Sequence, residues 1–331
     1  MIIVKITVLD MDTAVIDGDI SLDELSELGN LKIIGKTGFD DTVELIGDAE
    51  AVICNKTRIT RDVMKSCPDL KYVGLMGTGF DQVDIAAACE RGITVCNVPA
   101  YSSEAVAQHT FALILNHFCR ISEYVTDCAE GGWREKKYLS VFGRETHELA
   151  GKTIGLIGCG GIGGRVAKIA HAFGMRVLVF NRSPEKLRNF SCVTPASLET
   201  LLRESDVVSI HCPLNESSRE LLNRRTLSLM KPTALLVNTS RGGIINEADL
   251  AQALNEGRIA AAAVDVLTEE PMTEGTPLLH AKNIVFTPHV AWAPVETRRR
   301  LFETVAANLR AFLAGSPQNV VQNQPHTEGK E

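Results

Sequence analysis

The sequence has few aromatic residues, no long apolar run and no paired-cysteine motif. Its 331 residues include only two Trp and four Tyr, and no apolar stretch approaches the length of a membrane-spanning helix. The nine cysteines contain no C-x-x-C spacing, so neither a metal site nor a disulfide framework is predicted. Free thiols suit a reducing compartment, and we expect a cytoplasmic protein with no membrane partner.

Positive charge is also scarce relative to negative charge. The formal net charge is −7, and the one dense basic cluster is Arg298–Arg300, which we expect on the solvated face of a helix. This balance argues against binding to nucleic acid or to an anionic membrane, because both need a basic surface. The apolar N-terminus carries Lys5 in its middle and has no small-residue cleavage pattern, so it is interpreted as a first β-strand.

The length and the 45% apolar fraction predict two domains, each with its own core. In residues 1–100, β-rich runs alternate with helix-like ones, and strands are predicted at Ile2–Leu9, Leu31–Ile34, Ala51–Cys54, Tyr72–Met76 and Thr94–Asn97. From residue 151 onward the alternation predicts six strands, at Thr153–Ile157, Val177–Phe180, Val207–His211, Leu235–Thr239, Ala262–Val266 and Ile284–Phe286. Strands that alternate with crossover helices form a doubly wound parallel sheet, so the second domain is predicted to be a Rossmann domain.

Two helices are expected to connect the domains. Residues 104–121 are apolar on most faces, which predicts a buried bridging helix in which His109 and His117 are hydrogen-bonded packing residues. Residues 291–314 carry one apolar stripe and are expected to return the chain to the first domain. The Rossmann domain, 101–291, is thus predicted to be inserted into a smaller flavodoxin-like α/β substrate domain made of 1–100 and 292–331, with a cleft between them.

Two segments lack a clear pattern. The stretch 131–149 places Trp133, Tyr138 and Phe142 among charged residues, which predicts a long loop with a function or an interface to cover. Beyond Gly315 the chain is polar and is expected to be loosely ordered.

The Gly-Cys-Gly-Gly-Ile-Gly motif is the strongest functional signal. Gly158, Gly160 and Gly163 have the G-x-G-x-x-G spacing between a predicted strand and a predicted helix, which is the context of a dinucleotide-binding turn. The glycines permit the tight turn, the approach of a pyrophosphate and close packing of helix on strand. The predicted cofactor site includes the motif and the polar residues after the neighbouring strands: Gly158, Gly160, Gly161, Ile162, Gly163, His211, Cys212, Pro213, Thr239, Ser240 and Asp265, the last toward the nicotinamide amide.

The end of the second strand distinguishes the two nicotinamide cofactors. A protein that prefers NAD usually has an acidic residue there, but Asn181 occupies this place, 18 residues beyond Gly163, and Arg182 and Ser183 follow it. An arginine can pair with a 2′-phosphate, which a carboxylate would repel. NADP is therefore favoured over NAD, although Asn181 could equally bond an ordinary ribose hydroxyl.

Three polar residues follow strands of the second sheet at their carboxyl ends, where ligands of such sheets bind. His289 suits the proton donor that ketone reduction needs, and Glu270 suits the carboxylate that would orient its ring. Arg241 can hold a substrate carboxylate and carbonyl in a two-pronged grip. His211 is the competing histidine. In the first domain, Gly77, Thr78 and Gly79 form a turn that could receive a substrate carboxylate or could be an ordinary connection.

These motifs together resemble the D-isomer-specific 2-hydroxyacid dehydrogenase family. The resemblance runs through Gly158–Gly163, Asn238–Gly243, Val264–Pro271 and Thr287–Trp292, and therefore along nearly the whole chain. Within the family, Ala105–Leu113, Glu148–Gly155 and Trp292 resemble the glycerate dehydrogenase or hydroxypyruvate reductase branch.

The resemblance implies a role for several residues. Arg241 would bind substrate, Glu270 would pair with His289 as the acid/base, and Gly77–Gly79 would lie against the substrate carboxylate, with Trp292 also at the substrate. It further implies a homodimer built through the nucleotide domain. Asn181 departs from the Asp that many relatives carry, and so puts NAD preference in doubt.

The expected activity is NAD(P)H-dependent reduction of a 2-keto acid, hydroxypyruvate and also glyoxylate, to the D-2-hydroxy acid. Three alternatives stay open. The substrate could be a bulkier 2-keto acid, the enzyme could be a phosphoglycerate dehydrogenase, or the chain could be a dinucleotide-sensing binding protein in transcription.

Overall fold

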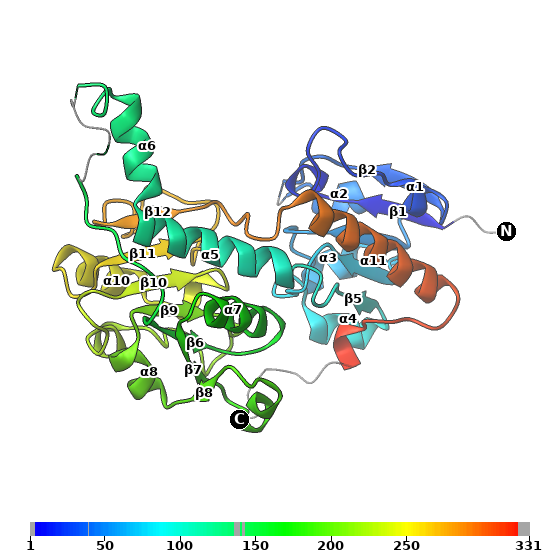
Figure 1. Ribbon diagram of the computed structural model, residues 1–331. Coiled ribbons are helices and arrows are strands. Elements are labelled where there is room, and N and C mark those ends of the chain that lie inside the picture. The colour runs from blue at the N-terminus through cyan, green and yellow to red at the C-terminus, as the bar shows by residue number, and fades with distance from the viewer. Residues whose placement is uncertain (1–3, 39, 136–139, 141–142, 324–331) are drawn as a thin grey trace. The chain divides into compact units, whose positions relative to one another are not determined.

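The computed structural model describes residues 4–38, 40–135, 140 and 143–323, and divides the chain into two compact units. The first unit comprises the residues up to Tyr101 together with the segment from Trp292 onward, and the second comprises Ser102–Ala291. Figure 1 shows both as sheets with helices on their faces. Tyr138, Phe142 and the residues after Asn323 lie outside the described part of the chain.

The first unit is built on a parallel sheet with the strand order β2-β1-β3-β4-β5. Its strands are β1 (Lys5–Val8), β2 (Asn30–Ile33), β3 (Ala51–Cys54), β4 (Tyr72–Leu75) and β5 (Thr94–Cys96). The described helices are α1 (Asp23–Ser26), α2 (Thr42–Ile46), α3 (Arg61–Ser66), α4 (Ile85–Arg91) and α11 (Val295–Leu313), with short 3₁₀ turns at Met11–Thr13 and Val321–Asn323. This order is the flavodoxin-like one, as predicted.

Apolar side chains fill both faces of this sheet. The α11 residues Leu301, Val305 and Leu309 pack on Ile6 and Tyr72 at one face. The other face is covered by α2, α3 and α4. The end of the chain therefore supplies one helical layer of a sheet that its beginning forms.

The second unit has a parallel sheet of seven described strands in the order β12-β11-β10-β9-β6-β7-β8. Its strands are β6 (Thr153–Ile157), β7 (Arg176–Phe180), β8 (Thr194–Pro195), β9 (Val207–Ile210), β10 (Leu235–Asn238), β11 (Ala261–Val264) and β12 (Ile284–Phe286). The order reverses between β6 and β9, which is the arrangement of a Rossmann sheet extended by one strand. The prediction of six strands was wrong, because the two-residue β8 is too short to leave a pattern.

Helices cover both faces of the second sheet. One face packs against α5 (Ser103–Cys119) and α7 (Gly161–Ala172), and the other against α8 (Leu198–Glu204), α9 (Arg224–Leu227) and α10 (Glu247–Asn255). Short 3₁₀ turns occupy Pro184–Asn189 and Gly242–Ile244. No helix in the described ranges combines the length and the apolar character needed to cross a bilayer.

The predicted helix over residues 104–121 ends earlier and is followed by a second helix. Arg120 adopts a left-handed conformation with φ of 55°, which separates α5 from α6 (Ile121–Ala129). The Asn116 carboxamide oxygen accepts hydrogen bonds from the backbone N–H and the hydroxyl of Ser122, and so stabilises this break. Residues 122–129, to which the sequence analysis assigned no element, are therefore helical.

The structure corrects two expectations about the C-terminal segment. Of the three arginines expected on the solvated face, Arg299 and Arg300 are exposed, but Arg298 is only 5% exposed, because its guanidinium forms an ion pair with Asp19 and donates to the Ala293 carbonyl oxygen. The chain beyond Gly315 is anchored as far as it is described. The Gln322 side chain bonds the backbone of Ile93 and Val95, and Val321 is buried.

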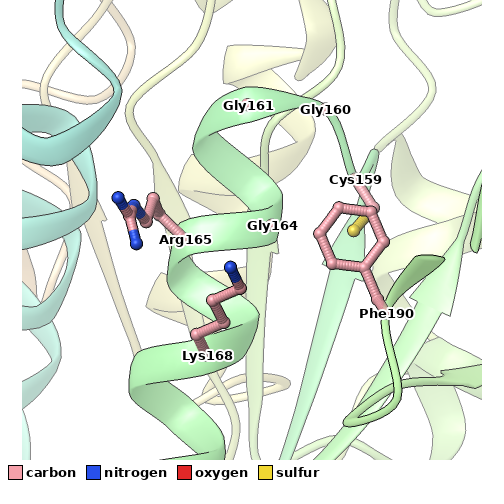
Figure 2. Close-up of a pocket in the computed structure, with 7 residues that line it drawn as sticks. All are labelled: Cys159, Gly160, Gly161, Gly164, Arg165, Lys168 and Phe190. Carbon is pink, nitrogen blue, oxygen red and sulfur yellow. The ribbon is translucent and has the colours of Figure 1, made fainter.

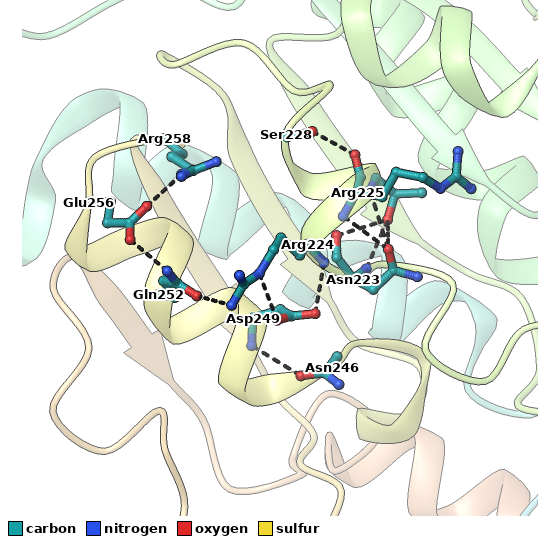
Figure 3. Close-up of polar contacts among 10 residues, drawn as sticks. Asn223, Arg224, Arg225, Ser228, Asn246, Asp249, Gln252, Glu256 and Arg258 are labelled. Atoms are coloured by element: carbon teal, nitrogen blue, oxygen red, sulfur yellow. Dashed lines mark hydrogen bonds and ion pairs between the residues drawn. The ribbon is translucent and has the colours of Figure 1, made fainter.

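A polar network on the surface joins α9 to α10 (Figure 3). The Asp249 carboxylate accepts from the Arg224 backbone N–H, and the Arg224 guanidinium donates to Gln252. Asn223 and Asn246 cap the two helices with their side chains. These contacts fix the start of α10, which begins at Glu247, six residues after Arg241.

Candidate active site

The glycine turn connects β6 to α7, and two of its glycines are required by the fold itself. Gly158 has φ of +94°, and a Cβ there would lie 2.8 Å from backbone atoms of His211 and Cys212. A Cβ on Gly163 would lie 2.4 Å from the Gly158 carbonyl oxygen. Both positions therefore exclude any other residue.

Gly160 differs from these two glycines. A Cβ at this position would meet no atom of the described residues within 4 Å, and φ is negative. Since nothing in the protein requires glycine here, the open space at the N-terminus of α7 fits a ligand, and a pyrophosphate suits both the space and the helix dipole. Gly161 and Ile162 occupy the first turn of α7, where Ile162 packs partly on the core.

A hollow of about 520 Å³ lies alongside α7 (Figure 2). Cys159, Gly160 and Gly161 line it together with Arg165, Lys168 and Phe190, which the sequence analysis did not single out. The Phe190 ring packs on Gly164, where a Cβ would lie 2.5 Å from a ring carbon. Arg165 forms an ion pair with Glu104 of α5. The i, i+3 spacing of Arg165 and Lys168 after the motif was the available signal for them.

Asn181 lies directly after β7, beside the glycine turn. Its carboxamide oxygen accepts from the Cys159 backbone N–H at 3.4 Å, and its amide nitrogen donates to the Ser183 carbonyl oxygen at 2.8 Å. Arg182 is exposed and Ser183 is half-buried. The position that would hold a ribose-binding acid thus holds a neutral amide engaged with the backbone.

His211, Cys212 and Pro213 follow β9, across the sheet's switch point from the glycine turn. Burial lowers the pKa of His211 to about 3, and its Nε2 is hydrogen-bonded to the Ser209 hydroxyl at 2.9 Å. Burial also raises the pKa of the Cys212 thiol to about 11. His211 is therefore neutral near pH 7 and is unsuited to donate a proton as an imidazolium.

Arg241 ends the loop that follows β10. Thr239 is buried, Ser240 donates to the Cys212 carbonyl oxygen, and the Asn238 side chain donates to the Arg241 carbonyl oxygen at 2.9 Å. The next residue, Gly242, touches the backbone of Leu267, where a Cβ would approach to 1.9 Å. The Arg241 loop is thereby packed against the segment that leads to Glu270.

His289 and Glu270 are in direct contact. The His289 Nδ1 lies 2.6 Å from a Glu270 carboxylate oxygen, and the other oxygen of Glu270 accepts from the Leu267 backbone N–H at 3.1 Å. His289 has φ of 55°, an uncommon left-handed conformation for a residue with a side chain. The side chains of His289 and Glu270 are 24% and 31% exposed, so the pair is accessible from solvent.

Asp265 holds the loop that carries His289. One carboxylate oxygen accepts from the Thr287 hydroxyl and from the Val290 backbone N–H, and the other accepts from the Ala291 backbone N–H. The Asp265 carbonyl oxygen also accepts from the His289 backbone N–H at 2.8 Å. Asp265 is 2% exposed, and the structure thus gives its carboxylate a positioning role that the sequence analysis missed. Its contact with the nicotinamide stays a prediction.

The remaining predicted substrate residues belong to the first unit. The Gly77–Gly79 turn follows β4 and is pinned by the chain after β5: Val98 donates to the Gly77 carbonyl oxygen, and Thr78 donates back to the Val98 carbonyl oxygen. Trp292 packs edge-on against Tyr101, with ring centroids 6.4 Å apart. Their roles at a substrate stay predictions.

Comparison with known proteins identifies the class. The family model for the NAD-binding domain of D-isomer-specific 2-hydroxyacid dehydrogenases matches residues 111–291. The chain belongs to this family and is an oxidoreductase with an NAD(P)-binding Rossmann domain, which confirms the resemblance stated from the sequence. Within the family it belongs to the glycerate dehydrogenase or hydroxypyruvate reductase branch.

Two curated relatives support the branch. The chain is 39% identical over 322 residues to a hydroxypyruvate reductase of Blautia hydrogenotrophica, covering 96% of this chain and 99% of the relative. It is 38% identical over 285 residues to a glycerate dehydrogenase of Methylorubrum extorquens, covering 86% and 88%. Among solved structures, an acyclic imino acid reductase in complex with NADPH and D-arginine is 32% identical, with a TM-score of 0.84 over 96% of this chain and 99% of that one.

The different roles of the glycines lead to a test. Gly160→Ala is expected to leave the melting temperature unchanged, because a Cβ there meets no atom of the described residues, yet to weaken NADPH binding about tenfold or more by crowding the pyrophosphate. Gly275→Ala, in a loop far from the motif along the chain, is the matched control, since the nearest described atom to a Cβ there is the Thr273 hydroxyl oxygen at 3.8 Å, an ordinary contact distance. Fluorescence titration and thermal unfolding of the three proteins give both quantities. Equal NADPH affinity in Gly160→Ala and wild type would show that the turn does not hold the pyrophosphate.

Proposed function

We propose that this chain reduces hydroxypyruvate to D-glycerate, and glyoxylate to glycolate, with NADPH as the preferred hydride donor. The observation that carries the proposal is the contact between His289 Nδ1 and Glu270 at the carboxyl edge of a dinucleotide-binding sheet. The names of the two curated relatives support the choice of substrate. In this reading the second unit binds the dinucleotide and the first unit binds the substrate.

His289 would supply the proton. When bound, the reduced cofactor provides the hydride, which leaves negative charge on the carbonyl oxygen of the keto acid. Because Nδ1 is held by Glu270, Nε2 is the ring nitrogen that would give its proton to this oxygen. The Glu270 carboxylate would stabilise the imidazolium form of the ring before this proton is transferred. The Arg241 guanidinium would grip the substrate carboxylate and carbonyl and so orient the carbon for attack.

Turnover tests this assignment. We expect wild type to oxidise NADPH with hydroxypyruvate, and His289→Ala to lose about 10²–10⁴-fold in kcat, the usual contribution of a general acid. His117→Ala serves as the control, because His117 is a half-buried histidine of the same helix α5, whose pKa is lowered to about 4 by partial burial. Cofactor oxidation at 340 nm is compared for hydroxypyruvate, glyoxylate, a bulkier 2-keto acid and a phosphorylated one.

The rank order of kcat/KM separates the remaining candidates. A preference for the bulkier or the phosphorylated keto acid would keep the enzyme class and replace the substrate. Turnover in wild type no greater than in His289→Ala, with tight cofactor binding, would support a dinucleotide-sensing protein instead.

The preference for NADP is supported by Asn181, Arg182 and Ser183 after β7. An amide in the acid's place removes a negative charge, and the exposed Arg182 can pair with a 2′-phosphate. The imino acid reductase of similar fold was solved with NADPH.

A single substitution, which replaces the side-chain amide of Asn181 by a carboxylate, tests the cofactor preference. Asn181→Asp should lower kcat/KM for NADPH about tenfold or more and raise it for NADH, because a carboxylate repels a 2′-phosphate and bonds a free ribose hydroxyl. Asn246→Asp is the matched control, because the Asn246 side chain caps α10 by accepting from the Asp249 backbone N–H, which a carboxylate also does. Higher kcat/KM with NADH in wild type would refute the preference.

We also propose that the chain forms a homodimer through the second unit, on the evidence of α6. This helix projects from the end of α5 (Figure 1) and buries none of its residues. Ile121 and Val125 are 52% and 62% exposed, and Trp133 just beyond the helix is 55% exposed. Apolar side chains gathered on a projecting element are typical of a protein interface.

Sedimentation tests the dimer. Wild type is expected at twice the 35.9 kDa of one chain, and Val125→Glu is expected to be monomeric, because it places a charge in the apolar contact. Thr126→Glu alters the neighbouring exposed residue and should stay dimeric. A monomeric wild type would exclude the proposal.

A cytoplasmic location also stays a proposal, supported by nine cysteines that are all free thiols.

A further inference from the structure

Two consecutive residues of α5 contact the two loops that carry the proposed proton donor and substrate-binding residue. The His109 Nε2 lies 2.9 Å from the Thr287 hydroxyl oxygen, and Thr287 precedes His289 by two residues. The Thr110 hydroxyl oxygen lies 3.1 Å from that of Thr239, which precedes Arg241 by two residues.

The hydrogen bonds at His109 have a defined direction. Thr287 donates its single hydroxyl proton to the Asp265 carboxylate, with the two oxygens 2.5 Å apart. Thr287 must therefore accept from His109, which places a proton on the His109 Nε2. His109 thus donates to Thr287 and Thr287 donates to Asp265, whose carboxylate also accepts from the backbone N–H groups of the two residues that follow His289, Val290 and Ala291.

The bond at Thr110 is directed as well. Thr110 donates its hydroxyl proton to the Val106 carbonyl oxygen at 2.8 Å, so Thr239 donates to Thr110. Thr110 is fully buried and Thr239 nearly so, and neither hydroxyl can exchange its partner for bulk water.

The helix that bears these residues is a rigid support. Ala107, Phe111 and Ile114 of α5 lie in the apolar core formed with α7 and with strands β6 to β11. A side chain fixed on such a support can set the place of a loop that has few core contacts of its own.

We propose that His109 and Thr110 are positioning residues that set the spacing between the His289 loop and the Arg241 loop. The proposal rests on the proposed function. His109 acts through Thr287 and Asp265 on the proton donor, and Thr110 acts through Thr239 on the residue that grips the substrate carboxylate. The two residues therefore affect different kinetic parameters.

The experiment compares four variants with wild type. His109→Leu removes the donor to Thr287, and kcat is expected to fall about tenfold or more with little change in KM, because the proton donor is misplaced. His109→Gln presents an amide N–H in its place and should recover most of kcat. Thr110→Val, which keeps the shape but loses the hydroxyl, should raise the KM for hydroxypyruvate more than it lowers kcat. His117→Leu, the same change elsewhere on α5, should match wild type.

A second readout does not depend on turnover. Hydrogen exchange followed by mass spectrometry reports the backbone amides of residues 287 and 289–291, three of which donate to Asp265, one to its carbonyl oxygen and two to its carboxylate. These amides are expected to exchange faster in His109→Leu than in wild type, His109→Gln or His117→Leu, while β6 exchanges equally in all of them.

The outcomes distinguish a failure of this proposal from a failure of the proposed function on which it rests. Equal kcat and KM effects in His109→Leu and Thr110→Val, or no gain in His109→Gln, would mean a general loss of folding and would overturn it. Should wild type reduce no 2-keto acid, the proposed function fails, and the exchange of residues 287–291 decides the proposal alone. Unchanged exchange there in His109→Leu would overturn it.

Discussion

The buried carboxylate of Asp265 is the constraint on which the candidate active site depends. A charge at 2% exposure is costly unless it is hydrogen-bonded, and here Thr287, Val290 and Ala291 donate hydrogen bonds to the carboxylate while the His109 Nε2 lies 3.6 Å from it. Those bonds hold His289 in a left-handed backbone conformation, which costs an ordinary residue about 1–2 kcal/mol.

The sheet places the rest of the site in order. The glycine turn and His211 follow β6 and β9, where the strand order reverses, and the loops with Arg241, Glu270 and His289 follow three strands that are neighbours, β10, β11 and β12. The dinucleotide turn and the acid/base pair are thus arranged along one edge of the sheet. Gly158 and Gly242 allow this by letting adjacent loops touch backbone to backbone.

Much of this arrangement was predictable because it follows from periodic patterns. The bounds of β6 and β12 agree with those expected from apolar runs. The contact of Glu270 with His289 agrees with the pairing that the family resemblance implied. Each error has an identifiable structural cause. The break at Arg120 depends on a left-handed residue that propensity does not reveal, and the burial of Arg298 depends on Asp19, which is distant in sequence.

The sequence by itself determined the two α/β domains, the dinucleotide turn and the family, because strand-helix alternation and glycine spacing are local and are written into consecutive residues. Only the tertiary structure decided that Asp265 serves the His289 loop, that His211 is neutral, and that Arg165, Lys168 and Phe190 lie beside the glycine turn. These properties depend on which side chains meet across the fold and on how far each is removed from water, and neither is encoded by the neighbours of a residue in the chain.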